Sequence, residues 1–247
     1  MKVWLMLTCV FLVLPTVAQG QIILNFSSSF PEELKDEAVS TVDLFSNWLK
    51  KQEQEVVLDD PIWFVSRNEA KQFLEEKLGV EIDEQSAKFV SGMVRCDRGA
   101  VVVASSFLQW SIVHELFHIL ECSLAGDMDV AFSIYFLAEG AADLAAYHLL
   151  GGILPPLAYD GQSSRLLGGS IFLVPRQLMT EEGWVEAMGK YGPAVVYRMA
   201  MLFTTDLYHH GGWRQILLYF RLLKDKPEEA FRRAFGVSLE EWLKKWE

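Results

Sequence analysis

The chain has 247 residues, of which 51% are hydrophobic and 22% are charged, and its formal net charge at pH 7 is −11. This length and composition support one substantial core in one or two closely packed lobes, and they argue against disorder outside the termini. The acidic balance makes nucleic acid a poor partner, because a phosphate backbone selects basic surfaces.

The first 20 residues have the pattern of a secretory signal peptide. Lys2 is a short basic region, residues 3–14 form a nearly continuous apolar run, and Ala18-Gln19-Gly20 offers small residues for cleavage. The pattern predicts a secreted or periplasmic protein whose mature chain begins at Gln21. The alternative is an uncleaved signal that anchors the protein in a membrane. No later segment has 18 uncharged apolar residues in a row, so no membrane span is expected after cleavage.

The first half of the mature chain has the patterns of a small mixed sheet with helices. The expected elements, in chain order, are a strand at 21–26, a helix at 31–51, a strand at 55–65, a helix at 68–78, and strands at 89–95 and 100–104. The last two strands flank Cys96-Asp97-Arg98-Gly99, which is typical of a hairpin turn.

The second half has helical periodicity almost throughout. Helices are expected at 105–124, 127–150, 181–190, 192–209, 212–223, 227–235 and 239–246, with a long loop at 152–175. The whole chain therefore predicts an α+β fold: a signal peptide at 1–20 and then a single domain at 21–247. In that domain an α/β lobe at 21–105 precedes a mainly helical lobe at 106–247, and the functional site is expected in the cleft between them.

An H-E-x-x-H motif, His114-Glu115-Leu116-Phe117-His118, lies within the helix expected at 105–124. Residues four apart lie on one face of a helix, so both imidazoles can reach one zinc ion. Glu115 projects from nearly the same edge and can take a proton from a water on the metal. Chance alone would produce this motif in roughly one such chain per hundred, so a third ligand is needed to support the assignment.

Glu139 is the candidate third ligand. A catalytic zinc usually takes three protein ligands and leaves a fourth position for water. Glu139 lies 21 residues beyond His118 in the next expected helix, which a short connection brings against the first. Asp143 follows on the same face and is placed to accept the free ring N–H of a ligating histidine. The alternative is that Glu139 and Asp143 are surface acids. The expected helix is so apolar, however, that two acids in it would be buried and would need a partner of opposite charge.

These motifs resemble the gluzincin metallopeptidases, and among them the compact bacterial and archaeal peptidase MA-like domains. The resemblance rests on the H-E-x-x-H motif, on Ala138-Glu139-Gly140 around the third ligand, and on a final helix like 230–246. It implies that the strand before the metal helix, Ala100 to Ala104, lies at the cleft edge and pairs with extended substrate. The Gly-x-Met-Glu-Asn element of the aminopeptidase branch does not precede His114.

The resemblance also implies a Tyr or His that stabilises the oxyanion. Tyr191 is the first candidate by its position, followed by His209 and His210, and the alternative is that all three are ordinary surface or core residues. Cys96 and Cys122 remain after signal cleavage, and they form either a disulfide of an exported protein or two small buried hydrophobes.

The residues together predict a secreted zinc metallopeptidase that acts on a peptide or protein substrate. Zn²⁺ is expected to be held by His114, His118 and Glu139, with Glu115 as general base. Two alternatives stay open: an inactive binding or assembly module of the same fold, and a zinc hydrolase with a non-peptide substrate. The choice between endo- and exopeptidase and the oligomeric state also stay open.

Overall fold

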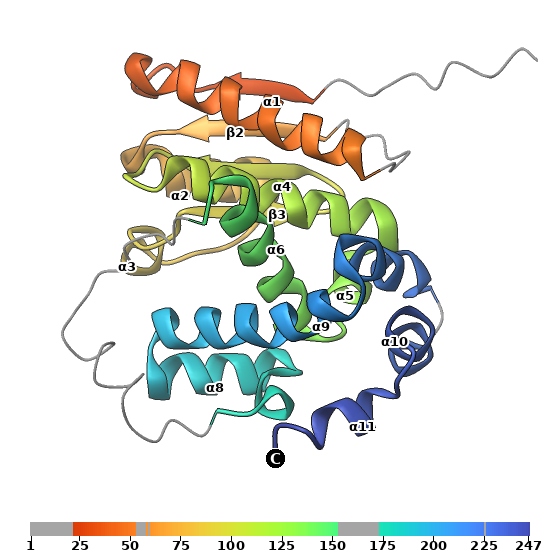
Figure 1. Ribbon diagram of the computed structural model, residues 1–247. Coiled ribbons are helices and arrows are strands. Elements are labelled where there is room, and N and C mark those ends of the chain that lie inside the picture. The colour runs from red at the N-terminus through yellow and green to blue at the C-terminus, as the bar shows by residue number, and fades with distance from the viewer. Residues whose placement is uncertain (1–21, 53–57, 59, 153–172, 225) are drawn as a thin grey trace, which may run out of the picture.

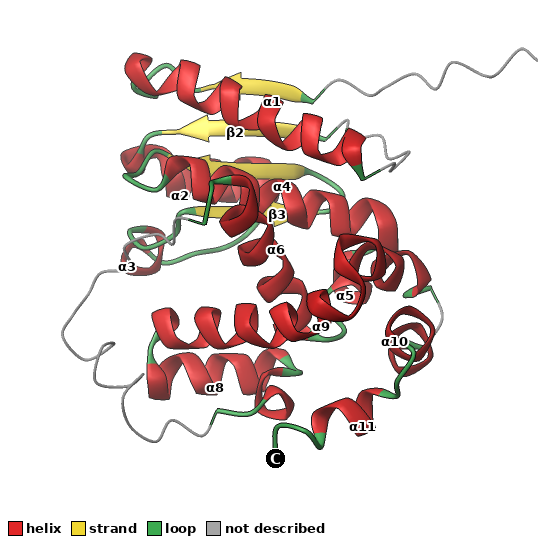
Figure 2. Ribbon diagram, viewed as in Figure 1, coloured by secondary structure: helices red, strands yellow, loops and turns green. Residues whose placement is uncertain are grey.

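The computed structural model describes residues 22–52, 58, 60–152, 173–224 and 226–247. The fold is α+β, as the sequence predicts: a small mixed sheet near the N-terminus precedes a mostly helical region (Figures 1 and 2). The expected signal peptide and most of the expected loop at 152–175 lie outside the described residues. Among the described residues, no helix is both long and apolar enough to cross a membrane.

Four strands form one sheet in the order β1-β2-β4-β3. The strands are β1 (Ile23–Phe26), β2 (Pro61–Val65), β3 (Gly92–Arg95) and β4 (Gly99–Val103). β1, β2 and β4 run parallel, whereas β3 pairs antiparallel with β4 through the predicted hairpin.

The predicted place of Ala100 to Ala104 at the cleft edge is therefore wrong. β4, which contains most of that segment, lies inside the sheet between β2 and β3. The physical reason is that every residue of β4 is buried, which suits a strand with a neighbour on each side. β3 therefore lies at the edge of the sheet. Gly92 of β3 lies opposite Val102 of β4 in this pairing.

Both faces of the sheet are covered by helices. Ile62, Phe64 and Val102 belong to the main core together with α1 (Lys35–Lys51) and α4 (Leu108–Ala125). The intervening side chains, such as Val101 and Val103, pack with Leu74 and Leu78 on the opposite face. That opposite face is covered by η2 (Arg67–Glu69), α2 (Ala70–Phe73) and η3 (Leu74–Leu78). Two further short helices are η1 (Glu32–Leu34), which leads into α1, and α3 (Glu84–Ala87), which precedes β3.

The helical region is built around α6 (Tyr135–Leu149), which packs between α4 and α9 (Pro193–Leu222). The remaining elements are α5 (Met128–Ala131), η4 (Pro175–Leu178), α8 (Glu181–Tyr191), α10 (Pro227–Phe235) and α11 (Leu239–Leu243). α8 lies alongside α9 in Figure 1, and α10 packs against α9 as well. At Gly140 a side chain would lie 2.4 Å from the Ala200 carbonyl oxygen, so α6 and α9 are in close contact there.

One expected helix is divided in the structure, and one expected break between helices is confirmed. The helix expected at 127–150 is divided into α5 and α6, because Asp127 caps a short helix that ends before α6 begins at Tyr135. The two helices expected at 192–209 and 212–223 are confirmed: α9 consists of two helices joined across a kink at Gly212, whose φ of 66° is not helical. Glycine adopts this backbone conformation without strain, so the chain can bend between the two helices.

A disulfide joins Cys96 to Cys122, with the two Cα atoms 5.3 Å apart. It confirms one of the two alternatives for these cysteines. Cys96 lies in the turn between β3 and β4, and Cys122 lies near the end of α4. The bond therefore fastens the edge of the sheet to the helix that carries the H-E-x-x-H motif.

Candidate metal centre

Three potential metal ligands converge where α4 meets α6. His114 and His118 lie one turn apart on α4, and Glu139 reaches them from the second turn of α6. The Nε2 atoms of the two histidines are 3.0 Å apart, and Glu139 Oε2 lies 3.3 Å from His114 Nε2 and 3.6 Å from His118 Nε2. This buried group could hold a metal ion.

The spacing of the three atoms fits a small tetrahedral ion. Metal–ligand bonds of about 2.0–2.1 Å at tetrahedral angles place the ligand atoms roughly 3.3 Å apart, which matches the observed separations. Glu139 Oε2 is buried and has no hydrogen-bond partner among the described residues. A cation between the three atoms would supply the missing partner, since a buried carboxylate is costly without one.

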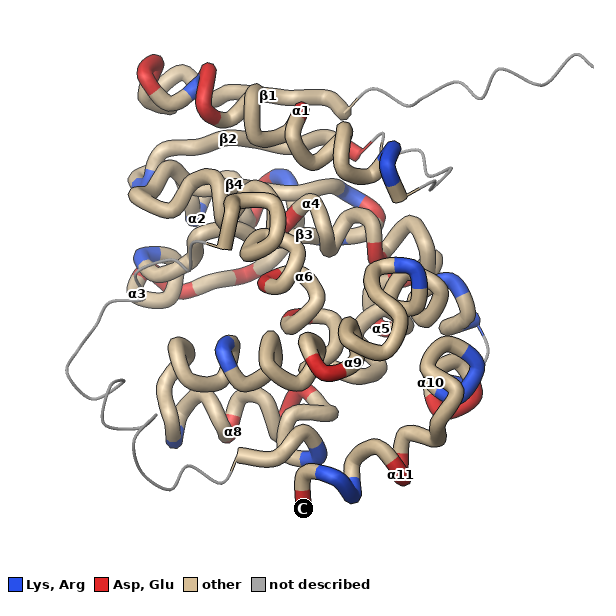
Figure 3. The backbone as a smooth tube through the Cα atoms, viewed as in Figure 1, with Lys and Arg blue, Asp and Glu red and all other residues tan. Residues whose placement is uncertain are grey.

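Two further carboxylates contact the Nδ1 atoms of the histidines, on the side of each ring away from the shared centre. Asp143 Oδ1 lies 2.9 Å from His114 Nδ1 and also accepts a hydrogen bond from Trp110 Nε1 at 3.1 Å. Glu121 Oε2 lies 2.7 Å from His118 Nδ1. When each Nδ1–H donates to its carboxylate, each Nε2 keeps a lone pair that points at the shared centre. Figure 3 shows acidic positions on α6 in the middle of the molecule.

The charges of the group are strongly coupled. Burial lowers the pKa of His114, but the neighbouring carboxylates of Asp143 and Glu139 outweigh it and hold the pKa well above its usual value. Burial opposes ionisation of Glu139, yet the two histidines lower its pKa to about 2. Burial raises the pKa of Glu121 to about 7 despite the opposing effect of His118. The pattern is that of carboxylates and imidazoles crowded around one point, where positive charge is favoured.

Glu115 is buried beside this group, with 6% of its surface exposed. Its carboxylate is not among the three converging ligand atoms. Burial raises its pKa, partly offset by the two neighbouring histidines. Gly92, on the edge strand β3, lies so close that a side chain there would come within 2.5 Å of Glu115 Oε1. The carboxylate therefore lies between the metal group and the edge of the sheet.

Tyr197, in the first turns of α9, is a tyrosine that lies close to the three ligand atoms. Its ring centroid lies 6.1 Å from that of His114, and the nearby Glu139 carboxylate, together with burial, raises its pKa well above the usual value. Tyr191 ends α8, where its ring lies 4.8 Å from the Lys190 ammonium. His209 and His210 lie twelve and thirteen residues beyond Tyr197 on α9, about 18 Å of helix rise, beside Tyr208 and Asp206.

Comparisons with protein-family models, curated proteins and solved structures found no match to this chain. The resemblance to gluzincins thus stays a prediction that rests on the motif residues themselves. Four residues that the sequence predicts at the site lie together in the structure: His114, His118, Glu139 and Asp143.

Glu121 and Tyr197 are the site residues that the sequence interpretation missed. A signal for Glu121 was present, since an acid three residues after His118 in an apolar helix needs a buried partner just as Glu139 does. Tyr197 carried no comparable signal, because its position depends on how α9 packs across α6.

Proposed function

We propose that this protein is a zinc-dependent hydrolase of peptide bonds. The observation that carries the proposal is the convergence of His114 Nε2, His118 Nε2 and Glu139 Oε2, all within 3.6 Å of one another. Each imidazole is also held at its other nitrogen by a carboxylate, an arrangement typical of metal-ligating histidines. Two histidines and one carboxylate form the ligand set of catalytic zinc sites that activate water.

The protein groups around the ion have distinct tasks. A zinc ion held there would lower the pKa of a water ligand and polarise the scissile carbonyl. Glu115 accepts a proton from the attacking water and later donates it to the leaving amine nitrogen. Tyr197, close to His114, is the candidate that donates a hydrogen bond to the developing oxyanion, in place of Tyr191.

We further propose that the protein acts outside the cytoplasm. The signal-like N-terminus motivates this proposal, and the Cys96–Cys122 disulfide supports it, because such bonds persist mainly in exported proteins. Intact-mass analysis of protein from its native host should show a mature chain that begins at Gln21. A membrane-bound form that retains residues 1–20 would contradict cleavage of the signal peptide.

The test of function combines zinc content with cleavage of a mixed peptide library. The protein should bind one zinc ion and cleave peptides, and a chelator should abolish cleavage until zinc is restored. Zinc at a thousand times its Kd would stabilise the fold by about 4 kcal/mol, or roughly 10 °C in Tm. Zinc binding without cleavage of any peptide would favour a non-peptide substrate, and the absence of both would favour a binding module.

A further inference from the structure

Glu121 is a completely buried acid that takes no part in the proton transfers of the proposed mechanism. None of its surface is exposed, and its Oε2 lies 2.7 Å from His118 Nδ1. Its other oxygen, Oε1, has no hydrogen-bond partner within the described part of the chain. The ion pair that the structure gives it is with His118.

Burial of such a group needs a physical reason. A carboxylate taken out of water is strongly destabilising unless an opposite charge or strong hydrogen bonds compensate it. A neutral imidazole offers one N–H and no charge, which is weak compensation. An imidazole whose other nitrogen, Nε2, binds a dication is a much better partner, because the metal withdraws electron density from the ring and strengthens the N–H donor.

We propose that Glu121 is the positioning residue of the second metal ligand. It accepts the Nδ1–H of His118, which fixes the tautomer that leaves Nε2 free to bind the ion, and it increases the basicity of the ring. This inference rests on the proposed zinc site. It gives Glu121 the same relation to His118 that Asp143 has to His114.

The surroundings of Glu121 are rigid enough for this task. It lies three residues after His118 on α4, so the two side chains share one face of the helix. The next residue, Cys122, is bonded to Cys96 at the hairpin of the sheet. On another side, the ring of Phe132 packs 5.0 Å from that of His118. The imidazole is thus held at Nδ1 and packed against an aromatic ring.

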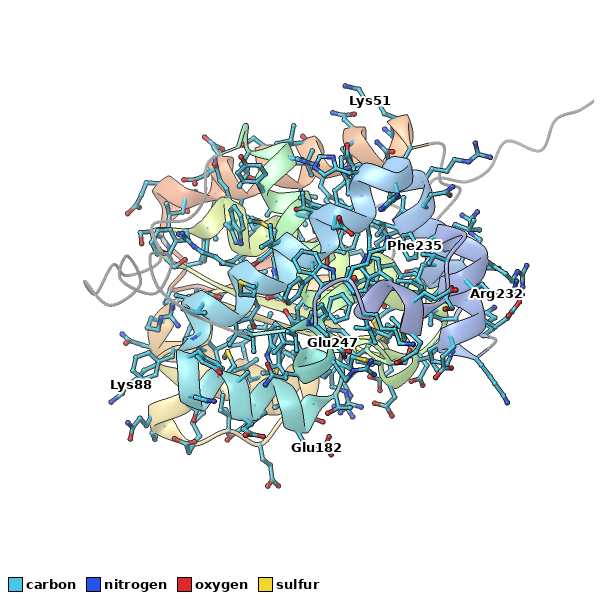
Figure 4. The ribbon with its side chains drawn as sticks, turned by 60° about the horizontal axis from the view of Figure 1, so that its bottom comes forward. Lys51, Lys88, Glu182, Arg232, Phe235 and Glu247 are labelled. Carbon is cyan, nitrogen blue, oxygen red and sulfur yellow. A yellow bond between two sulfur atoms is a disulfide. The ribbon has the colours of Figure 1, made fainter. Side chains whose placement is uncertain are left out.

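The test compares Glu121→Ala and Glu121→Gln with wild type and with Glu182→Gln. Glu182 is an exposed glutamate on α8, visible at the surface in Figure 4, so its variant controls for the loss of a charge. Zinc affinity is measured by chelator competition, and the visible spectrum of the Co²⁺-substituted protein reports ligand geometry. Circular dichroism checks that each variant is folded.

Glu121→Ala should weaken zinc binding roughly 10- to 100-fold and shift the Co²⁺ bands. Glu121→Gln should weaken it less, because its amide oxygen still accepts the N–H, and Glu182→Gln should match wild type. A folded Glu121→Ala with wild-type affinity and an unchanged spectrum would overturn the inference. If that variant does not fold, wild-type affinity in Glu121→Gln overturns it.

Failure of the proposed function would look different. Wild-type protein that binds zinc but cleaves no peptide would refute the peptidase and leave the role of Glu121 intact. Wild-type protein that cleaves peptides while Glu121 variants keep full zinc affinity would refute only the positioning role. Wild-type protein that binds no zinc would overturn both.

Discussion

Replacement of Glu115 by Gln separates proton transfer from metal binding. The substitution keeps the shape of the side chain and removes its basicity. The Glu115 carboxylate is not among the three converging ligand atoms, so zinc affinity should stay within a few-fold of wild type. Only the step that needs a base next to the attacking water should suffer.

The size of the effect follows from the environment of the side chain. With 6% of its surface exposed, Glu115 leaves little room for bulk water to replace it as a base. A positioned general base contributes about 10²- to 10⁴-fold to the rate, so the barrier should rise by about 3–5 kcal/mol. The Tm should not fall, because the change removes one negative charge from a buried group that contains three other carboxylates, Glu121, Glu139 and Asp143.

The assay is kcat/KM on a peptide selected from the library, alongside zinc stoichiometry and thermal melting. Glu182→Gln, on the exposed face of α8, is the matched control and should behave as wild type. A Glu115→Gln protein that binds zinc and cleaves at the wild-type rate would refute the general-base assignment, although the metal site would stand. A variant that loses zinc would show that Glu115 is itself a ligand.

Four other variants test the site and the elements that surround it. Glu139→Ala should remove most zinc binding and Asp143→Ala should weaken it roughly 10- to 100-fold, measured by chelator competition; equal affinity in both would contradict their different roles. Gly92→Ala should reduce cleavage while zinc is retained, because the new Cβ would lie 2.5 Å from the proposed base, and unchanged kinetics would refute that contact. Replacement of both Cys96 and Cys122 by Ala opens a loop with a sequence separation of 26 and should cost about 3.5 kcal/mol, measured by denaturant unfolding; no loss would show that the bond does not stabilise the fold.

The three candidate metal ligands could be predicted because the position of each follows from local geometry. Helical spacing alone puts His114 and His118 on one face, and a short connection forces the next helix against the first. The apolar surroundings of Glu139 then marked it as a buried acid in need of a partner. The α+β order of elements followed in the same way from changes in periodicity along the chain.

The parts that could not be predicted depend on long-range packing. Whether β3 or β4 takes the edge of the sheet is decided by the pairing of β4 with β2, some 38 residues earlier in the chain. Likewise, Tyr197 lies near His114 because α9 packs on α6, where Gly140 permits close contact. Neither the strand order nor the helix crossing leaves a periodic pattern in the sequence.

Four buried carboxylates lie around two histidines, which favours positive charge at this centre. Glu139 faces the shared point, Glu121 and Asp143 hold the imidazoles from behind, and Glu115 lies toward the edge strand at Gly92. With all four acids ionised and both histidines neutral the group would carry a formal charge of −4, and a dication at the shared point would halve it. A bound zinc ion would therefore favour the burial of these acids, so we expect zinc binding and fold stability to be coupled. Glu115 lies close to Gly92 of the edge strand, which is where a proton acceptor has to be if an extended peptide lies along β3.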